Sequence, residues 1–470
     1  MRLRRRHSNF SIITLAGILL ICGLARTGAA AEPVATFTLA NGLEVVVLPD
    51  HRLPIVTHVV YYRAGSADDP PGQTGIAHFT EHLMFKGTKR YPTGQYDLIV
   101  TNAGGSNNAF TSNDKTYYYE QILKEGLPRI MDLDADRMTN LDFAPIEATH
   151  ELKVVMEERR AYRNDPDSML AESTGRALYE KGIRVYAHPV LGEPDETEAL
   201  TLAAALSFHA LNYAPDNAIL IVAGDVTPQY VRQLAEATYG RIPAHAPQHR
   251  DRTWAKADTP CAEGRVVERR QRVTRDKASL YFLTPGALGM GVRTAAALRL
   301  LADLLQDQGT SPLWLELVGR SGLASELSVG HDLKLAAGEF SINLVAEQGV
   351  PASQLQTALQ DSLGRLRVKG IPAAALSAAK RRWQANWLLS ADDQLGLATH
   401  YGEQLSIGRT VAEIQREPQT IENVSLPEIN AVLHDFLSNR CFVVANLEHS
   451  GEANESLDGQ PSGHPTGMAH

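Results

Sequence analysis

The chain has 470 residues, of which 44% are apolar, so it is long enough to bury the cores of two domains of ordinary size. Its formal net charge of -9 gives no general attraction to nucleic acid or to anionic membranes, which excludes polyanion binding as its main function. Three cysteines in this length exclude a disulfide scaffold, although one bridge between Cys261 and Cys441 is left open.

The first 31 residues have the pattern of an export signal. Four arginines near the start precede an apolar run over 12–24, and Ala29-Ala30-Ala31 supplies a small-residue cleavage site. The run is shorter than the roughly 20 residues of a membrane span, which disfavours the alternative of an uncleaved anchor. Residues 1–31 are therefore predicted to be a signal peptide for export to the bacterial periplasm. Its removal takes away five arginines and no acid, and changes the net charge from -9 to -14.

Apolar periodicity and turn residues predict an alternation of strands and helices in the first half. The predicted elements are strands over 36–39, 43–48 and 55–63, a helix over 75–86, a strand pair within 108–122, a helix over 126–139, one or two helices over 145–181, a helix before Asn212, a strand over 218–223 and a helix from Pro228. Asn41-Gly42, between the first two strands, is typical of a tight hairpin turn.

The predicted helix over 75–86 carries His78 and His82 four residues apart, with Glu81 between them. Residues four apart lie on the same face of a helix, so the two imidazoles can bind one metal ion while the Glu81 carboxylate stands beside it. Two surface histidines are the alternative interpretation. A catalytic zinc site also needs a third protein ligand and an open fourth position.

A second helical segment offers that third ligand. Glu151 and Glu158 are seven residues apart, which is two turns along one helix face. One carboxylate could bind the metal and the other could orient a histidine ligand. The mixed run Glu157-Glu158-Arg159-Arg160 is also typical of a solvated helix face, so both interpretations stay open from the residues alone.

These motifs and their neighbours resemble the inverted-zincin peptidases, the HxxEH family of pitrilysin, insulinase and mitochondrial processing peptidase. The similar segments are 75–88, 108–112, 151–158, 213–217 and 222–225. The similarity covers nearly the whole mature chain and is greatest to the short exported bacterial subunits of the processing-peptidase-like branch.

The resemblance implies a role for each residue of the candidate site. His78, His82 and Glu158 would bind one Zn²⁺ per chain, and Glu151 would support a histidine ligand from behind. Glu157 is the rival third ligand, but the spacing from Glu151 favours Glu158.

The resemblance also assigns the groups that meet the substrate. Glu81 would be the catalytic base, and Asn108 and Ala109 would lie on an edge strand that holds an extended peptide by backbone hydrogen bonds. Thr111, Asp114 and Tyr118 are expected to organise that strand and its loop rather than to perform chemistry.

The second half is predicted to repeat the first without the metal. Gly-Thr pairs at 87–88 and 309–310 end equivalent helices, and their alignment places Leu300, Asp303 and Leu304 opposite the HxxEH residues. The expected fold class is α+β, with two similar domains from an internal duplication, each a mainly antiparallel sheet covered by helices. The predicted bounds are a zinc-binding domain over 32–241, a polar linker over 242–264, a second domain over 265–449 and a disordered tail over 450–470.

Active members of the resembled family commonly have an Arg and a Tyr seven residues apart in the second domain, where they steady the substrate and the oxyanion. Val318 and Ser325 stand at those positions here, and Arg320 is two residues out of register. Loss of one oxyanion donor typically costs about a hundredfold to a thousandfold in rate.

We therefore expect a zinc-dependent endopeptidase that acts on peptides or small unfolded polypeptides. It would be the metal-bearing subunit of a heterodimer with a related chain that supplies Arg and Tyr, with no nucleic-acid partner and no stable membrane anchor after signal cleavage. The alternative is a non-catalytic scaffold or peptide-binding subunit of the same fold.

Overall fold

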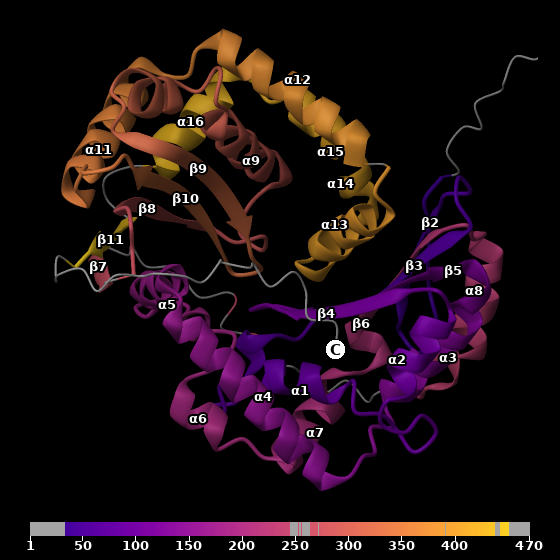
Figure 1. Cartoon of the computed structure of the whole chain (residues 1–470). Helices are drawn as coiled ribbons and strands as arrows, with labels where there is room; N and C mark the ends of the chain where they lie inside the picture. Colours follow the sequence, from indigo (N-terminus) through magenta and orange to yellow (C-terminus); the bar gives the residue numbers. More distant parts are fainter. Residues whose placement is uncertain are drawn as a thin grey trace, which may run out of the picture.

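The computed structural model describes residues 33–244, 252, 255, 264–270, 272–390, 392–437 and 442–450. The predicted signal peptide, most of the predicted linker, nearly all of the tail and both Cys261 and Cys441 lie outside these residues, so those predictions stay predictions. The chain forms two α+β units, each with one mainly antiparallel sheet and covering helices (Figure 1). No helix among the described residues is long and apolar enough to span a bilayer.

The first unit contains a six-stranded sheet in the order β1-β2-β6-β3-β5-β4. Its strands are β1 (Ala35–Thr38), β2 (Glu44–Pro49), β3 (Ile55–Tyr62), β4 (Ser106–Thr111), β5 (Thr116–Leu123) and β6 (Ala218–Gly224). All neighbours are antiparallel except β2 and β6. The predicted hairpin is confirmed: β1 pairs with β2, and Gly42 takes a left-handed φ of +92° that favours glycine.

Most helices of the first unit lie on one side of this sheet. The helices are α1 (Ile76–Leu83), α2 (Gln95–Asn102), α3 (Leu127–Arg137), α4 (Pro145–Asn164), α5 (Pro166–Tyr179), α6 (Pro194–Glu198), α7 (Leu202–Asn212) and α8 (Pro228–Ala237). Of these, α5 extends to the second unit. Side chains such as Val60 and Leu220 of the sheet pack against Phe79 and Leu133 of the helices to form the main core. The predicted helical stretch over 145–181 is two helices, separated at Asp165.

The second unit repeats the strand order of the first. Its strands are β7 (Gly264–Arg270), β8 (Lys277–Pro285), β9 (Ala324–Leu333), β10 (Ala337–Ala346) and β11 (Phe442–His449). Their order, β7-β11-β8-β10-β9, matches β2-β6-β3-β5-β4 position by position, and β7–β11 is parallel as β2–β6 is. This identity of topology supports the predicted duplication.

The helices of the second unit include the counterpart of α1. They are α9 (Val292–Gln306), α10 (Pro312–Trp314), the π-helical turn η7 (Leu315–Arg320), α11 (Ala352–Lys369), α12 (Ala373–Ser390), α13 (Gln394–Ser406), α14 (Val411–Gln415), α15 (Glu417–Glu422) and α16 (Leu426–Phe436). Helix α9 follows β8 as α1 follows β3. Its Leu300 and Leu304, which the predicted alignment places opposite His78 and His82, are fully buried in the second core.

Two helices hold the units together. Helix α5 of the first unit packs against β7 and β11, and α13 packs on the face of the first sheet opposite α1 (Figure 1). There Ala398 and Tyr401 of α13 contact the cluster that contains Tyr61 and Ile221. The first sheet is therefore covered on both faces, and the second half of the chain provides one of the covers.

Candidate metal centre

Helix α1 begins at a point where the backbone must take an unusual conformation. Gly75 has a φ of +89°, and a Cβ there would lie 2.9 Å from the Leu191 oxygen. The Asp69 carboxylate accepts hydrogen bonds from the backbone N–H groups of Gly75 (2.7 Å) and Ala77 (3.0 Å). These bonds satisfy N–H groups that the helix itself leaves unpaired.

The structure brings His78, His82 and Glu158 together. Nε2 of His82 lies 3.4 Å and Nε2 of His78 lies 3.7 Å from the same oxygen, Oε2 of Glu158. Each of the three side chains offers one possible ligand atom, and these three atoms lie within 4.8 Å of one another. Glu157, the rival ligand, is 68% exposed on the side chain and pairs with Arg160 instead.

This donor set fits a divalent metal such as zinc. Two imidazole nitrogens and one carboxylate oxygen are the three protein ligands of many catalytic zinc sites, with the fourth position left for water. Burial lowers the pKa of His78 to about 3, and the nearby His82 adds to that effect. His78 is thus neutral at neutral pH and keeps a lone pair for a metal, as ligation requires. Burial would also lower the pKa of His82, but its hydrogen bonds to Glu151 and Glu158 raise that pKa to about 9, so a metal would displace a proton there.

Glu151 fixes the orientation of His82. Its Oε1 lies 2.7 Å from Nδ1 of His82, and its other oxygen pairs with Lys86. Because an ionised carboxylate only accepts, Nδ1 carries the proton and Nε2 is directed to Glu158. Burial would raise the pKa of Glu151, but the hydrogen bonds from His82 and Lys86 outweigh it and lower that pKa to about 2.

Glu81 is held between α1 and the edge strand β4. The hydroxyl of Thr111 donates a hydrogen bond to Oε2 of Glu81 at a distance of 2.5 Å. Burial raises the pKa of Glu81, while the charge of His82 and the Thr111 hydrogen bond oppose the rise. A carboxylate with a raised pKa beside a metal centre is suited to accept a proton and to return it.

Strand β4 lies at one edge of the first sheet, where a peptide can be added. Asn108 and Ala109 are in its middle, paired with Tyr119 and Tyr118 of β5. The Asn108 side chain accepts a hydrogen bond from the N–H of Ala109 (2.8 Å), and Ala109 is buried. On its other side β4 pairs with no strand among the described residues, which suits strand addition.

A second group of possible metal ligands lies in the core of the first unit but does not fit a metal. His58, Glu120 and Asp134 are fully buried close to one another. The guanidinium of Arg137 already lies 3.2 Å from Glu120 and 2.6 Å from Asp134. A cation therefore compensates these carboxylates, and the cluster is a buried ion-pair network of the core.

The positions predicted to lack Arg and Tyr lie in the second unit. Val318 is half-buried in η7 and packs against the second core. Ser325 is on β9, where its hydroxyl oxygen accepts a hydrogen bond from Arg275 (2.8 Å). Arg320 is exposed at the end of η7.

Two histidines on one helix, a glutamate from a second helix and a buried carboxylate beside them have the arrangement of the inverted HxxEH motif. The family comparisons agree. Residues 44–185 match the model described as insulinase, peptidase family M16, and residues 199–382 match the peptidase M16 inactive domain. The chain belongs to this metallopeptidase family, which confirms the resemblance read from the sequence.

Relatives along most of the chain are named as zinc proteases. The zinc protease PqqE of Helicobacter pylori is 31% identical over 392 residues, which cover 81% of this chain and 85% of that protein. The uncharacterized zinc protease YmxG of Bacillus subtilis is 24% identical over 89% of this chain and 99% of its own length.

Solved structures have the same fold. A protease from Helicobacter pylori superposes with a TM-score of 0.78 at 25% identity, over 88% of this chain and 99% of that one. The first half of the periplasmic protease PqqL from Escherichia coli gives a TM-score of 0.75 at 19% identity, over 89% of this chain and 92% of that one. The second likeness concerns the fold alone.

Proposed function

We propose that this protein is a zinc-dependent endopeptidase that hydrolyses peptides or small unfolded polypeptides. The observation that carries the proposal is the convergence of His78, His82 and Glu158 next to a buried Glu81. The names of the relatives support zinc as the metal. One ion per chain belongs to the proposal, with His78, His82 and Glu158 as its ligands. The alternative is that the protein is a non-catalytic scaffold or peptide-binding subunit of the same fold.

The proposed chemistry uses each residue of the site. Zinc, when bound by His78, His82 and Glu158, would supply Lewis acidity that polarises the scissile carbonyl and acidifies water. Glu81 takes the proton from the attacking water and returns it to the leaving amine. The edge of β4 at Asn108 and Ala109 holds the peptide in an extended form by backbone hydrogen bonds, which tolerates varied sequences.

The proposal includes a related partner chain that supplies the Arg and Tyr missing at Val318 and Ser325. The full-length PqqL structure from Escherichia coli offers a precedent in length: this chain covers 48% of it, so that protein joins about two such lengths in one polypeptide. Export by the signal over 1–31 to the periplasm and the domain bounds 32–241 and 265–449 belong to the same proposal.

The test uses the mature chain, residues 32–470, purified alone. Its zinc content is measured by elemental analysis, and cleavage of a quenched unstructured peptide is followed with and without a chelator. Glu81→Gln is expected to keep zinc and lose turnover, whereas His78→Ala and Glu158→Ala are expected to lose zinc. Glu157→Gln is the matched control for Glu158, and it is expected to keep both zinc and turnover.

The heterodimer is tested by adding a related chain encoded nearby that carries the Arg and Tyr. Stimulation of cleavage by this chain supports the proposal, and full activity of the isolated chain refutes the need for a partner. Zinc bound in the absence of any cleavage, with or without the partner, favours the scaffold alternative.

A further inference from the structure

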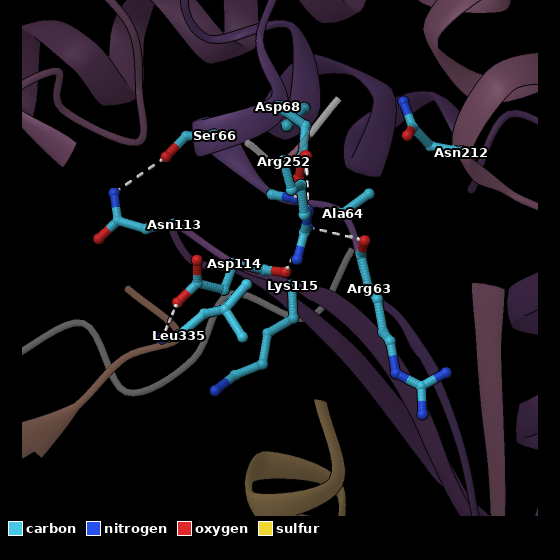
Figure 2. Close-up of polar contacts among 12 residues, drawn as sticks. Arg63, Ala64, Ser66, Asp68, Asn113, Asp114, Lys115, Asn212, Arg252 and Leu335 are labelled. Carbon is cyan, nitrogen blue, oxygen red and sulfur yellow. Dashed lines mark hydrogen bonds and ion pairs between the residues drawn. The ribbon is translucent and has the colours of Figure 1, made fainter. Parts of the chain in front are cut away.

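The turn between β4 and β5, residues 112–115, is held by parts of the chain that are far apart in sequence (Figure 2). It directly follows Thr111, which contacts Glu81. The backbone closes this turn through a hydrogen bond from the N–H of Ser112 to the Lys115 oxygen (2.8 Å).

Asp114 ties the turn to the second unit. Its side chain is buried, with 3% exposed, and Oδ2 accepts a hydrogen bond from the N–H of Leu335 (2.9 Å) in the β9–β10 connection. Oδ1 accepts one from the hydroxyl of Tyr186 (2.6 Å), which itself accepts from the N–H of Ala336 (3.1 Å). The neighbouring Lys115 pairs with Glu403 of α13.

The opposite side of the turn is joined to the loop that leads into α1. The N–H groups of Ser66 and Ala67 donate to the oxygens of Ser112 (2.9 Å) and Asn113 (2.8 Å). A Cβ at Gly65 would lie 2.3 Å from the Ser112 oxygen, so the two backbones leave no room for a side chain. Two positions beyond Ala67, Asp69 caps the N-terminus of α1.

A residue of the predicted linker bridges the same two segments. The guanidinium of Arg252 contacts both carboxylate oxygens of Asp68 (2.9 and 2.5 Å) and donates to the backbone oxygens of Asp114 (3.1 Å) and Arg63 (2.8 Å) (Figure 2). Hydrogen bonds that a carboxylate accepts, or that a guanidinium donates, are strong and directional when they are buried.

We propose that Asp114 is a positioning residue that couples the placement of the second unit to the geometry of the catalytic helix. Asp114 binds the β9–β10 connection to the turn at 112–115. This turn then holds Thr111 against Glu81, and it holds the loop at 65–69 against the start of α1. The proposal rests on the proposed function for its effect on turnover. Misplacement of reacting groups by about 1 Å can cost about a hundredfold in rate, so a loose turn matters for chemistry.

The test compares Asp114→Ala with Ser173→Ala in the mature chain. Ser173 donates to Glu268 across the interface of α5 and β7 (2.7 Å), so its loss also removes a hydrogen bond between the units but leaves the turn alone. Backbone hydrogen exchange is followed by mass spectrometry, which requires no activity. Asp114→Ala is expected to speed exchange both at 333–337 and in α1, and Ser173→Ala is expected to leave α1 unchanged.

Turnover is the second measurement. Asp114→Ala is expected to lower kcat about tenfold to a hundredfold while KM and zinc content stay near those of the wild type. Tyr186→Phe removes one of the two bonds to Asp114, together with the bond that the hydroxyl accepts from Ala336, and keeps the bond from Leu335 to Asp114, so it is expected to give a smaller change of the same kind. If Asp114→Ala does not fold, Tyr186→Phe decides the outcome by the same two measurements.

Two results overturn the proposal. The first is faster exchange confined to 333–337, with α1 as in the wild type. The second is a kcat of Asp114→Ala equal to that of Ser173→Ala. If the wild type cleaves no peptide with or without the partner chain, the proposed function fails, and the exchange experiment still decides whether Asp114 couples the units to α1.

Discussion

The hydrogen bond between Thr111 and Glu81 gives the most direct test of how the site is assembled. Thr111→Val replaces the hydroxyl by a methyl group of similar size, so the donor to Glu81 is lost with little change in volume. Thr111 also lies 3.3 Å from the hydroxyl of Thr116, but that hydroxyl donates to the Ala64 oxygen (3.0 Å) and keeps this partner. The substitution therefore affects chiefly the proposed base.

The expected fall in kcat follows from the strength of the hydrogen bond between Thr111 and Glu81. A hydrogen bond to a charged group contributes about 1.5–3 kcal/mol. If that energy holds Glu81 in its reacting position, its loss corresponds to a fall of about tenfold to a hundredfold in kcat. Zinc binding should be unchanged, because His78, His82 and Glu158 do not contact Thr111 through any hydrogen bond of the described residues.

The assay measures kcat and KM on a quenched peptide, with zinc content determined on the same samples. Thr111→Ser restores the hydroxyl without the methyl group and should recover most of the lost kcat. Wild-type turnover by Thr111→Val would refute the view that this bond positions the base. Equal losses in Thr111→Val and Thr111→Ser would assign the effect to packing.

Three further outcomes follow from other contacts. Glu151→Gln keeps an acceptor for His82 but removes the charge, so zinc affinity in a chelator competition should fall about tenfold; an unchanged affinity contradicts the supporting role. Gly65→Ala sets a methyl group against the Ser112 oxygen and should destabilise the fold by about 2–4 kcal/mol in calorimetry, whereas a wild-type Tm would argue against the close approach. Burial lowers the pKa of His331 from 6.5 to about 4, so the unfolded state binds a proton that the folded state excludes. Stability should be full above about pH 6.5 and fall towards pH 4, and His331→Gln should flatten that fall in Tm measurements across this range.

The zinc motif could be predicted because its geometry is local. The spacing from His78 to His82 and from Glu151 to Glu158 translates directly into one helix face. The spacing of seven residues from Glu151 favoured Glu158 over its neighbour Glu157, since adjacent residues on a helix differ by about 100° in direction. The structure has Glu158 beside both histidines and Glu157 in solvent.

Other features were missed because their signals are weak or non-local. Helix α2 (Gln95–Asn102) has only eight residues and starts after Gly94 in a left-handed conformation, so its pattern did not stand out. The packing of α13 on the first sheet joins residues more than 300 positions apart, as in the hydrogen bond from Tyr61 to Thr399. Sequence periodicity reports which face of an element is apolar but not which distant element covers it.

The two units show how one helix position can take opposite roles after duplication. In the first unit His78 and His82 of α1 face Glu158 of α4, while in the second unit Leu300 and Leu304, at the positions that the predicted alignment makes equivalent, are buried in the core. A helix whose equivalent face is fully buried has no open side for a metal or for water. The second unit instead meets the turn beside the proposed base from its surface, through the β9–β10 connection at Asp114 and through Glu403 of α13 at Lys115.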